Sequence, residues 1–480
     1  MGSVSFAALQ PPAMSSESHA KREVRVLARL ATPILLTNLC WMAVGLVDIV
    51  MLGRWSSEAV AAALLANVWV HLTQVVGMGL VMGIDPLVTQ GHGARDREAM
   101  GRALQRGVLV ALLASIPVIG FRFLTAEMLA AIRAFAEWAS DGAASAVPGS
   151  EISGAGELDE PGERYALIQS LATPFFLVYI AYRQYLQGRG ILRPALVVAA
   201  TANVVNAAVN WLFIFEFGWG IEGAGLATAL TRIFMFVSLL WLVRRHRLTR
   251  GASVPWDRAS FSIDGIRRVL RYGVPVALHF AFEMGAFGMT TLIAGVLGVT
   301  ATVAHGVALN VASMTFMVPL GIGLAATTRV GNLVGERRFD EAQESAHVAL
   351  WLGGLSMAAL GVVLYVGRDV LPGLYVPNDV SAIEMAALIL PIAAAFQVFD
   401  GIQVVGAGIL RGMGRTAPPA AFNFVAWWLI ALPLAWWLVL RRDGTLEDVW
   451  WSLVLGLGIV AVLAVAWIRA FGPRSMGDAK

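Results

Sequence analysis

The sequence predicts an all-α membrane protein with about twelve transmembrane helices in two six-helix repeats. Three observations support this fold class. Hydrophobic residues make up 58% of the 480 positions and charged residues only 14%, against roughly 25% charged in an average soluble protein. Apolar runs of about 20 residues, the length that crosses ~30 Å of hydrocarbon, recur along the chain. The pattern of the first half also returns in the second half. An ordinary soluble enzyme is therefore excluded.

The apolar runs are the expected membrane spans, with boundaries that hold to within a few residues. They lie near residues 28–53, 61–90, 103–123, 166–187, 194–216, 221–243, 267–297, 301–330, 344–367, 384–410, 418–440 and 449–471.

These spans divide the chain into two expected lobes, at residues 28–243 and 267–471, joined by a cytoplasmic linker at 244–266. Residues 1–27 are polar and form an expected N-terminal tail. The first apolar run is too long for a cleaved signal peptide, so we expect it to be retained as a span. Residues 472–480 form the expected C-terminal tail.

Basic residues predict the orientation, because Lys and Arg are retained on the cytoplasmic side of a membrane. The acidic, Gly- and Ser-rich segment 124–165 is expected to face the opposite side, as a periplasmic loop. We therefore expect both termini in the cytoplasm. The turns after the second, fourth and sixth spans carry the basic residues: Arg95, Arg97, Arg102, Arg106, Arg189, Arg193, Arg244, Arg245, Arg247 and Arg250.

The internal repeat is visible as aligned motifs. TPILLTNLCWMAVGLVDIVMLG in the first half matches VPVALHFAFEMGAFGMTTLIAG in the second. Pro33 thereby aligns with Pro275, and Asn67 with Asn310, at an almost constant spacing. An even number of spans separates the copies, so both lobes should have the same orientation and be related by an axis along the membrane normal.

Composition also limits partners and cofactors. The net charge is only +3, too small an excess for a nucleic-acid-binding face. The single cysteine, Cys40, excludes a disulfide framework and a cysteine-based metal site. No glycine-rich phosphate loop is present, so direct use of ATP is not expected. We expect no cofactor, no nucleic acid and no obligate protein partner; the partners are membrane lipid and a transported solute.

Three acids lie within apolar runs, where a charged side chain costs about 2.5 to 3.5 kcal/mol on insertion scales. They are Asp48, Glu283 and Asp400, and none has a basic residue within a helical turn. A low dielectric favours the neutral form of such an acid, which suits a proton-coupled carrier. Carboxylates are also hard ligands suited to Na⁺. The alternative is a buried acid that is hydrogen-bonded for packing.

Polar residues in the fifth and sixth spans are candidates to hold Asp48. Asn206 and Asn210 are four residues apart and share one helix face. Thr228 follows in the sixth span. The alternative is that these side chains only bridge helices in lipid.

Other polar residues at membrane depth are open to simpler interpretations. Asp85 precedes Pro86 and is expected to cap a broken helix, while His279 shows no metal-ligand spacing and is expected to pack between helices. Arg232 either pairs with an acid of the bundle or extends toward the interface. Four tryptophans are expected to anchor the interface: Trp427, Trp428, Trp436 and Trp437.

Several motifs in order are similar to those of one transporter family. They are VDIVMLG, PLVTQGHGA, AVNWLF, FEMGAF and FDGIQVVGAGILRG. On these motifs the chain resembles the multidrug and toxic compound extrusion (MATE) family, in its bacterial, NorM-like branch. The resemblance implies a V-shaped, two-lobed antiporter in the bacterial inner membrane that exports organic cations in exchange for H⁺ or Na⁺.

The resemblance also implies roles for individual residues. Glu283 and Asp400 would form the cation site of the second lobe, where Na⁺ is one candidate occupant. Bacterial relatives often have Tyr four residues before the acid of the tenth span, whereas this chain has Phe396. The coupling site of the first lobe would comprise Asp48, Asn206, Asn210 and Thr228.

Two rival functions remain at this point. A flippase for lipid-linked precursors would require a cationic cavity for phosphates, whereas the acids favour cationic cargo. An intramembrane enzyme would require a nucleophile with its base, or a set of metal ligands, on facing helices. We find neither motif in the sequence.

Overall fold

The computed structural model describes residues 19–139, 159–442 and 444–478, and these residues form helices without any strand. Eleven helices are long and apolar enough to span a membrane, and a twelfth span results if the bent pair α6 and α7 counts as one. The all-α, two-lobed fold class is therefore confirmed.

The described part of the first half contains five candidate spans and the bent pair α6 and α7. Its helices are α1 (His19–Trp55), α2 (Ser57–Val81), the 3-10 turn η1 (Met82–Ile84), α3 (Asp85–Gly93), α4 (Arg97–Arg122), α5 (Thr125–Ala139), α6 (Asp159–Ser170), α7 (Thr173–Gly188), α8 (Arg193–Trp211), the π-helical η4 (Leu212–Glu216) and α9 (Gly220–Arg245).

The second half repeats this order. Its helices are α10 (Ile263–Val296), α11 (Val299–Gly335), α12 (Phe339–Val366), α13 (Leu371–Tyr375), α14 (Val380–Gly412), α15 (Ala417–Asn423), the π-helical η5 (Phe424–Ala431), α16 (Leu432–Arg441), α17 (Leu446–Phe471) and the short α18 (Ser475–Asp478).

The region predicted as a loop at 124–165 is partly helical. Its first part forms α5, and its last part belongs to α6, which meets α7 at a bend of 50°. Leu129 in α5 and Tyr165 in α6 are buried, so both helices have an apolar face that favours helix over loop. Pro161 lies near the start of α6, where proline is tolerated. The stretch 140–158, with most of the predicted acidic insertion, lies outside the described residues.

One of the four predicted interfacial tryptophans is misassigned. Trp427 is fully buried and packs edge-on against Phe287, whereas Trp437 is 46% exposed, as an anchor requires. Trp427 lies in the π-helical segment η5. Neighbouring residues of a helix point in different directions, so an aromatic cluster need not face lipid as a whole.

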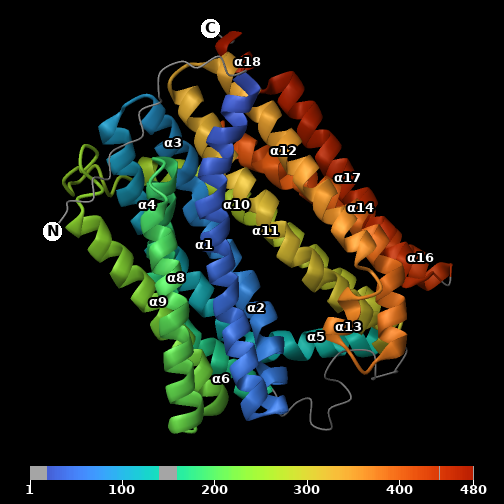
Figure 1. Cartoon of the computed structure of the whole chain (residues 1–480). Coiled ribbons are helices and arrows are strands. Elements are labelled where there is room, and N and C mark those ends of the chain that lie inside the picture. Colours follow the sequence, from blue (N-terminus) through green and yellow to red (C-terminus); the bar gives the residue numbers. More distant parts are fainter. Residues whose placement is uncertain (1–18, 140–158, 443, 479–480) are drawn as a thin grey trace.

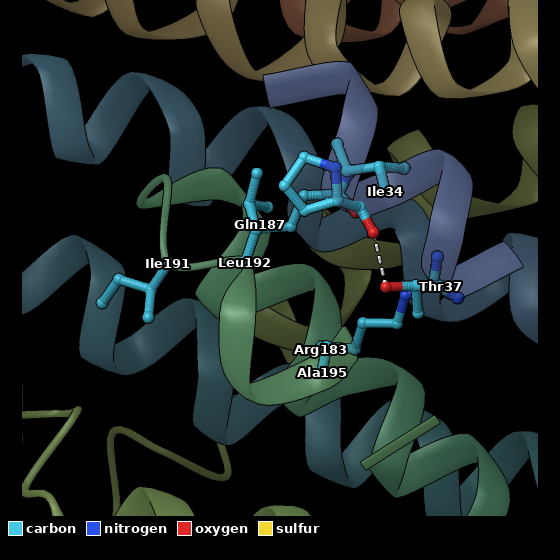
Figure 2. Close-up of a pocket in the computed structure, with 8 residues that line it drawn as sticks. Ile34, Thr37, Arg183, Gln187, Ile191, Leu192 and Ala195 are labelled. Atoms are coloured by element: carbon cyan, nitrogen blue, oxygen red, sulfur yellow. Dashed lines mark hydrogen bonds between the residues drawn. The ribbon is translucent and has the colours of Figure 1, made fainter. Parts of the chain in front are cut away.

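Pro33 lies inside α1, and its repeat partner Pro275 lies inside α10. Figure 2 shows the Thr37 hydroxyl donating to the Pro33 carbonyl oxygen, at 2.7 Å. This is the common bond of a helical threonine to the carbonyl four residues earlier, and it satisfies the Thr37 hydroxyl inside the helix. The adjacent pocket, which Arg183 also lines, has a volume of about 10 Å³, enough for one water but not for an organic cation.

The two halves approach each other at one end of the molecule and diverge toward the other, where α5 runs between them (Figure 1). We call the first end the closed end; it contains the start of α1, the turn between α3 and α4, and the end of α14. There the Gln90 amide donates to the Gly412 carbonyl at 3.0 Å, and Arg329 forms an ion pair with the buried Glu23. Gly83 leaves no room for a Cβ against the backbone of α10. The halves are thus in direct backbone contact at the closed end.

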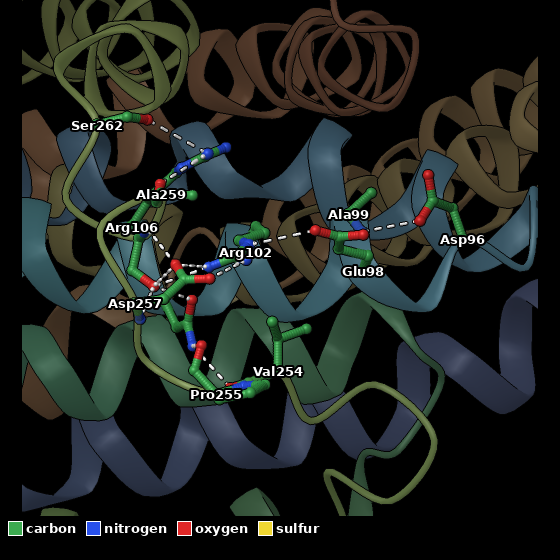
Figure 3. Close-up of polar contacts among 12 residues, drawn as sticks. Asp96, Glu98, Ala99, Arg102, Arg106, Val254, Pro255, Asp257, Ala259 and Ser262 are labelled. Atoms are coloured by element: carbon green, nitrogen blue, oxygen red, sulfur yellow. Dashed lines mark hydrogen bonds and ion pairs between the residues drawn. The ribbon is translucent and has the colours of Figure 1, made fainter.

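The connection between α9 and α10 docks onto α4 at the same end (Figure 3). Arg102 donates two hydrogen bonds to the Asp257 carboxylate, at 2.5 and 2.7 Å. The Gln105 amide donates to the Val254 carbonyl at 2.8 Å. The hydrogen bonds from Arg102 hold the pKa of Asp257 below its ordinary value. The linker is therefore fixed to the first half by charge and hydrogen bonds.

Candidate functional site

Asp48 lies on α1 and is 4% exposed. Its Oδ1 accepts hydrogen bonds from Asn206 Nδ2 at 3.1 Å and Asn210 Nδ2 at 2.6 Å. Its Oδ2 accepts one from Thr228 Oγ1 at 2.5 Å. The structure thus brings all four residues of the predicted first-lobe cluster together, with both carboxylate oxygens engaged.

Three helices build this cluster. Asn206 and Asn210 are one turn apart on α8, so both amides face α1, and Thr228 comes from α9. The two asparagines are fully buried. Every contact to Asp48 is a donor, which is the arrangement that favours an ionised carboxylate. The cluster stabilises negative charge inside the first lobe without placing a cation in direct contact.

Glu283 lies on α10 and is 7% exposed. His279, one turn earlier, places its Nε2 3.5 Å from Glu283 Oε2. The other ring nitrogen of His279 lies 2.7 Å from the Asn423 amide nitrogen. The His279 ring therefore lies between Asn423 of α15 and Glu283 of its own helix. His279 is therefore connected to the predicted second-lobe site rather than merely packed between helices.

Asp400 lies on α14, within electrostatic range of Glu283, and is 5% exposed. Its Oδ1 has no hydrogen-bond partner in the described structure. The structure therefore brings the second-lobe acids near each other but leaves part of this carboxylate unsatisfied. No hydrogen bond or ion pair between described residues joins this pair to the Asp48 cluster, so the described chain holds two separate polar centres.

Arg232 follows neither of its two predicted alternatives. Its side chain is buried, with the guanidinium 5.4 Å from the centre of the Phe176 ring. It interacts electrostatically with Asp48, yet the structure gives no ion pair between Arg232 and a described acid. Arg232 therefore neither extends to the interface nor pairs directly with an acid.

Asp85 does not cap the broken second span as expected. The break is present as η1, but the Asp85 side chain accepts from Gln184 Nε2, at 3.1 Å to each carboxylate oxygen. Arg411 of the second half lies 3.9 Å from Asp85, and both side chains are buried. This contact joins the halves at the closed end. Sequence analysis missed Arg411 because its position at the end of a span is also typical of an ordinary basic residue at an interface.

The carboxylates of the two polar centres are groups that can take up a proton or contribute oxygen ligands to a hard cation. Among the described residues, no group of three or more His, Cys, Asp or Glu side chains is arranged to hold a metal ion. A bound cation would therefore combine one or two carboxylates with hydroxyl, amide or backbone oxygens, the ligands that hard cations prefer.

Comparison with known proteins fits this geometry. The MatE family model matches residues 33–140 and 275–437, one segment in each half. Multidrug resistance protein NorM of Vibrio vulnificus strain YJ016 is 32% identical, over 92% of this chain and 94% of that protein. A probable multidrug resistance protein NorM of Bradyrhizobium diazoefficiens is 31% identical, over 98% of each chain.

Solved structures agree on the fold. The eukaryotic MATE transporter AtDTX14 superposes with a TM-score of 0.86 at 19% identity, over 96% of this chain and 98% of that one. An outward-facing multidrug resistance MATE family transporter gives a TM-score of 0.81 at 17% identity, over 97% and 100%. The chain therefore belongs to the MatE family of multidrug efflux transporters and is not an enzyme.

Proposed function

We propose that this chain exports organic cations across a bacterial inner membrane in exchange for H⁺ or Na⁺. The observation that carries the proposal is the set of acids buried in membrane helices: Asp48, Glu283 and Asp400 are all less than a tenth exposed. None makes an ion pair with a Lys or Arg of the described chain; Glu283 lies near His279, which is charged only when protonated. Acids held in this way are available to a proton or a cation.

The relatives support the choice of cargo. Two proteins that match nearly the full chain carry the name multidrug resistance protein, which implies chemically varied organic substrates. Buried carboxylates attract cations, and a phosphate-bearing lipid precursor would be repelled by them. No organic cofactor is needed for such exchange.

The contacts of the closed end support alternating access. Glu23–Arg329 and Asp85–Arg411 each join the two halves there. We propose that the closed end faces the cytoplasm, because the turns rich in arginine contact the linker there. Arg189, for example, donates a hydrogen bond to the Leu248 carbonyl at 2.6 Å. Opening toward the cytoplasm then requires both inter-lobe pairs to separate.

Transport into proteoliposomes tests the proposal. Purified protein is reconstituted, and a fluorescent organic cation is followed under a pH gradient or a sodium gradient imposed separately. We expect one of the two gradients to drive accumulation and the Asp48→Asn variant to lose it. Absence of dye movement under both gradients, with protein shown to be correctly folded in the liposomes, would contradict the proposal.

A further inference from the structure

Two arginines lie inside the first lobe, apart from the three acids. Arg122 ends α4 and is fully buried, and Arg232 lies in the middle of α9 and is 8% exposed. They face the same narrow gap, together with Gln74 of α2, Thr173 of α7 and the Phe176 ring. Four helices thus bring two guanidinium groups to one enclosed place.

The polar groups around this gap are mainly donors. Arg122 Nη1 donates to Thr173 Oγ1 at 3.1 Å, and Nη2 to Gln74 Oε1 at 3.5 Å. Arg122 Nε and Gln74 Nε2 are buried, and neither has a partner in the described structure. Since Thr173 accepts from Arg122, its own hydroxyl hydrogen is also available. The gap therefore has unused donors and lacks a matching acceptor.

Charge around the gap is also unbalanced. Neither arginine forms an ion pair with an acid in the described part of the chain, and the two guanidinium groups repel each other. Asp48 interacts electrostatically with Arg232 but does not contact it. Arg122 thus has no carboxylate near it among the interactions of the described residues, and a buried cation without a compensating charge is unfavourable. An anion between the arginines would satisfy both the charge and the free donors.

We propose that a small inorganic monovalent anion, of the size and charge of chloride, binds between Arg122 and Arg232. Gln74 and Thr173 complete its donor shell. In this structure the gap has no room for a water molecule, so binding of the anion requires the two long arginine side chains to move apart. Enclosure by buried residues excludes a large anion such as gluconate.

Thermal unfolding of the purified full-length protein tests this proposal. The midpoint is measured in sodium chloride and in sodium gluconate at equal concentration, so that the sodium concentration and ionic strength are unchanged. A ligand that binds only the folded state raises the midpoint. We expect the unfolding midpoint of the wild-type protein to be a few degrees higher in chloride than in gluconate, and this difference to saturate as the chloride concentration increases. The Arg122→Gln variant should show no such difference.

The Gln74→Glu variant gives a second, independent measurement. It supplies a fixed carboxylate at the position of the Gln74 amide, so its midpoint in gluconate should rise toward the wild-type value in chloride, and its response to chloride should disappear. Arg183→Gln is the matched control. Arg183 is also buried in this lobe but bonds Asn38 and does not line the gap, so this variant should retain the chloride response.

The outcomes are distinct. Equal wild-type midpoints in chloride and gluconate would overturn the proposal, and so would a full chloride response in Gln74→Glu. If Arg122→Gln does not fold, Gln74→Glu still decides the question, because it adds a partner for the arginines instead of removing one.

Discussion

Asp48 in the first half and Asp400 in the second half are buried acids on long helices, but their surroundings differ. Asp48 accepts three hydrogen bonds from three side chains. Asp400 has an oxygen without a partner and another acid, Glu283, within electrostatic range. The first carboxylate is held by donors that favour its charge, whereas the second is close to a like charge that opposes it.

This difference suggests that the acids of the two halves have different roles in transport. A carboxylate whose two oxygens both accept hydrogen bonds is fixed in place and responds to a proton as a single group. Two neighbouring acids, of which Asp400 has an oxygen without a partner in the described structure, are better suited to share one proton or to accept a cation. We therefore expect substitutions in the two centres to affect transport in different ways.

The largest effect is expected for Asp48→Asn. The amide keeps the size of the carboxylate, and Thr228 can reverse its hydroxyl to accept a hydrogen bond, so the fold should persist. The variant cannot exchange a proton at this position, so drug resistance of cells that express it should fall to that of cells without the transporter. Membrane yield and helicity measured by circular dichroism serve as folding controls. Resistance equal to wild type would remove Asp48 from the mechanism.

The second centre is expected to act as a unit. Glu283→Gln and Asp400→Asn should each weaken binding of a cationic dye about tenfold, the change that ~1.4 kcal/mol produces. If the two acids share one cation, the double variant should be no weaker than the more affected single variant. Fluorescence titration of all four proteins measures this coupling. Strictly additive losses of affinity would indicate two independent acids. The Glu283→Asp variant keeps the charge and shortens the side chain, so it tests whether the length of the side chain matters.

A smaller effect, on stability, is expected for Thr228→Val. It removes one donor from Asp48 and leaves a buried carboxylate oxygen unsatisfied, which costs about 1 to 3 kcal/mol. Thr231→Val is the matched control on the same helix, because its buried hydroxyl bonds only the Ala227 backbone carbonyl. We expect a lower unfolding midpoint for Thr228→Val than for Thr231→Val. Equal midpoints would mean that this hydrogen bond contributes little to holding Asp48.

The smallest effect is expected for Asp257→Asn, at the surface ion pair with Arg102. Because Arg102 lowers the pKa of Asp257, this contribution to stability is present above the ordinary Asp value and is lost only as pH falls through the lowered value. The pair therefore stays charged from about pH 5 to 8. Dye binding across that range should have the same pH profile in Asp257→Asn as in wild type, so any pH dependence belongs to the buried acids. A shifted profile in this variant would contradict that assignment.

Sequence analysis reached much of the first centre but less of the second. The four-residue spacing of Asn206 and Asn210 predicts a shared face, and the structure directs that face at Asp48. His279 and Glu283 have the same spacing, but the sequence alone does not distinguish a packing histidine from one linked to an acid. The link to Asn423 depends on how α15 packs against α10, which periodicity does not encode.

Hydropathy along the sequence predicts about twelve spans, their approximate positions and the presence of acids within them. Hydropathy is a local property, and a polar group in hydrocarbon is costly wherever the helices pack. Which partner each charged side chain contacts depends on how the helices pack against one another. The partners of Asp48 are 158 to 180 residues away in sequence, and Asp85 contacts Arg411 across the two halves. Helix rotation and crossing set these contacts, and they depend on the packing of all the helices together.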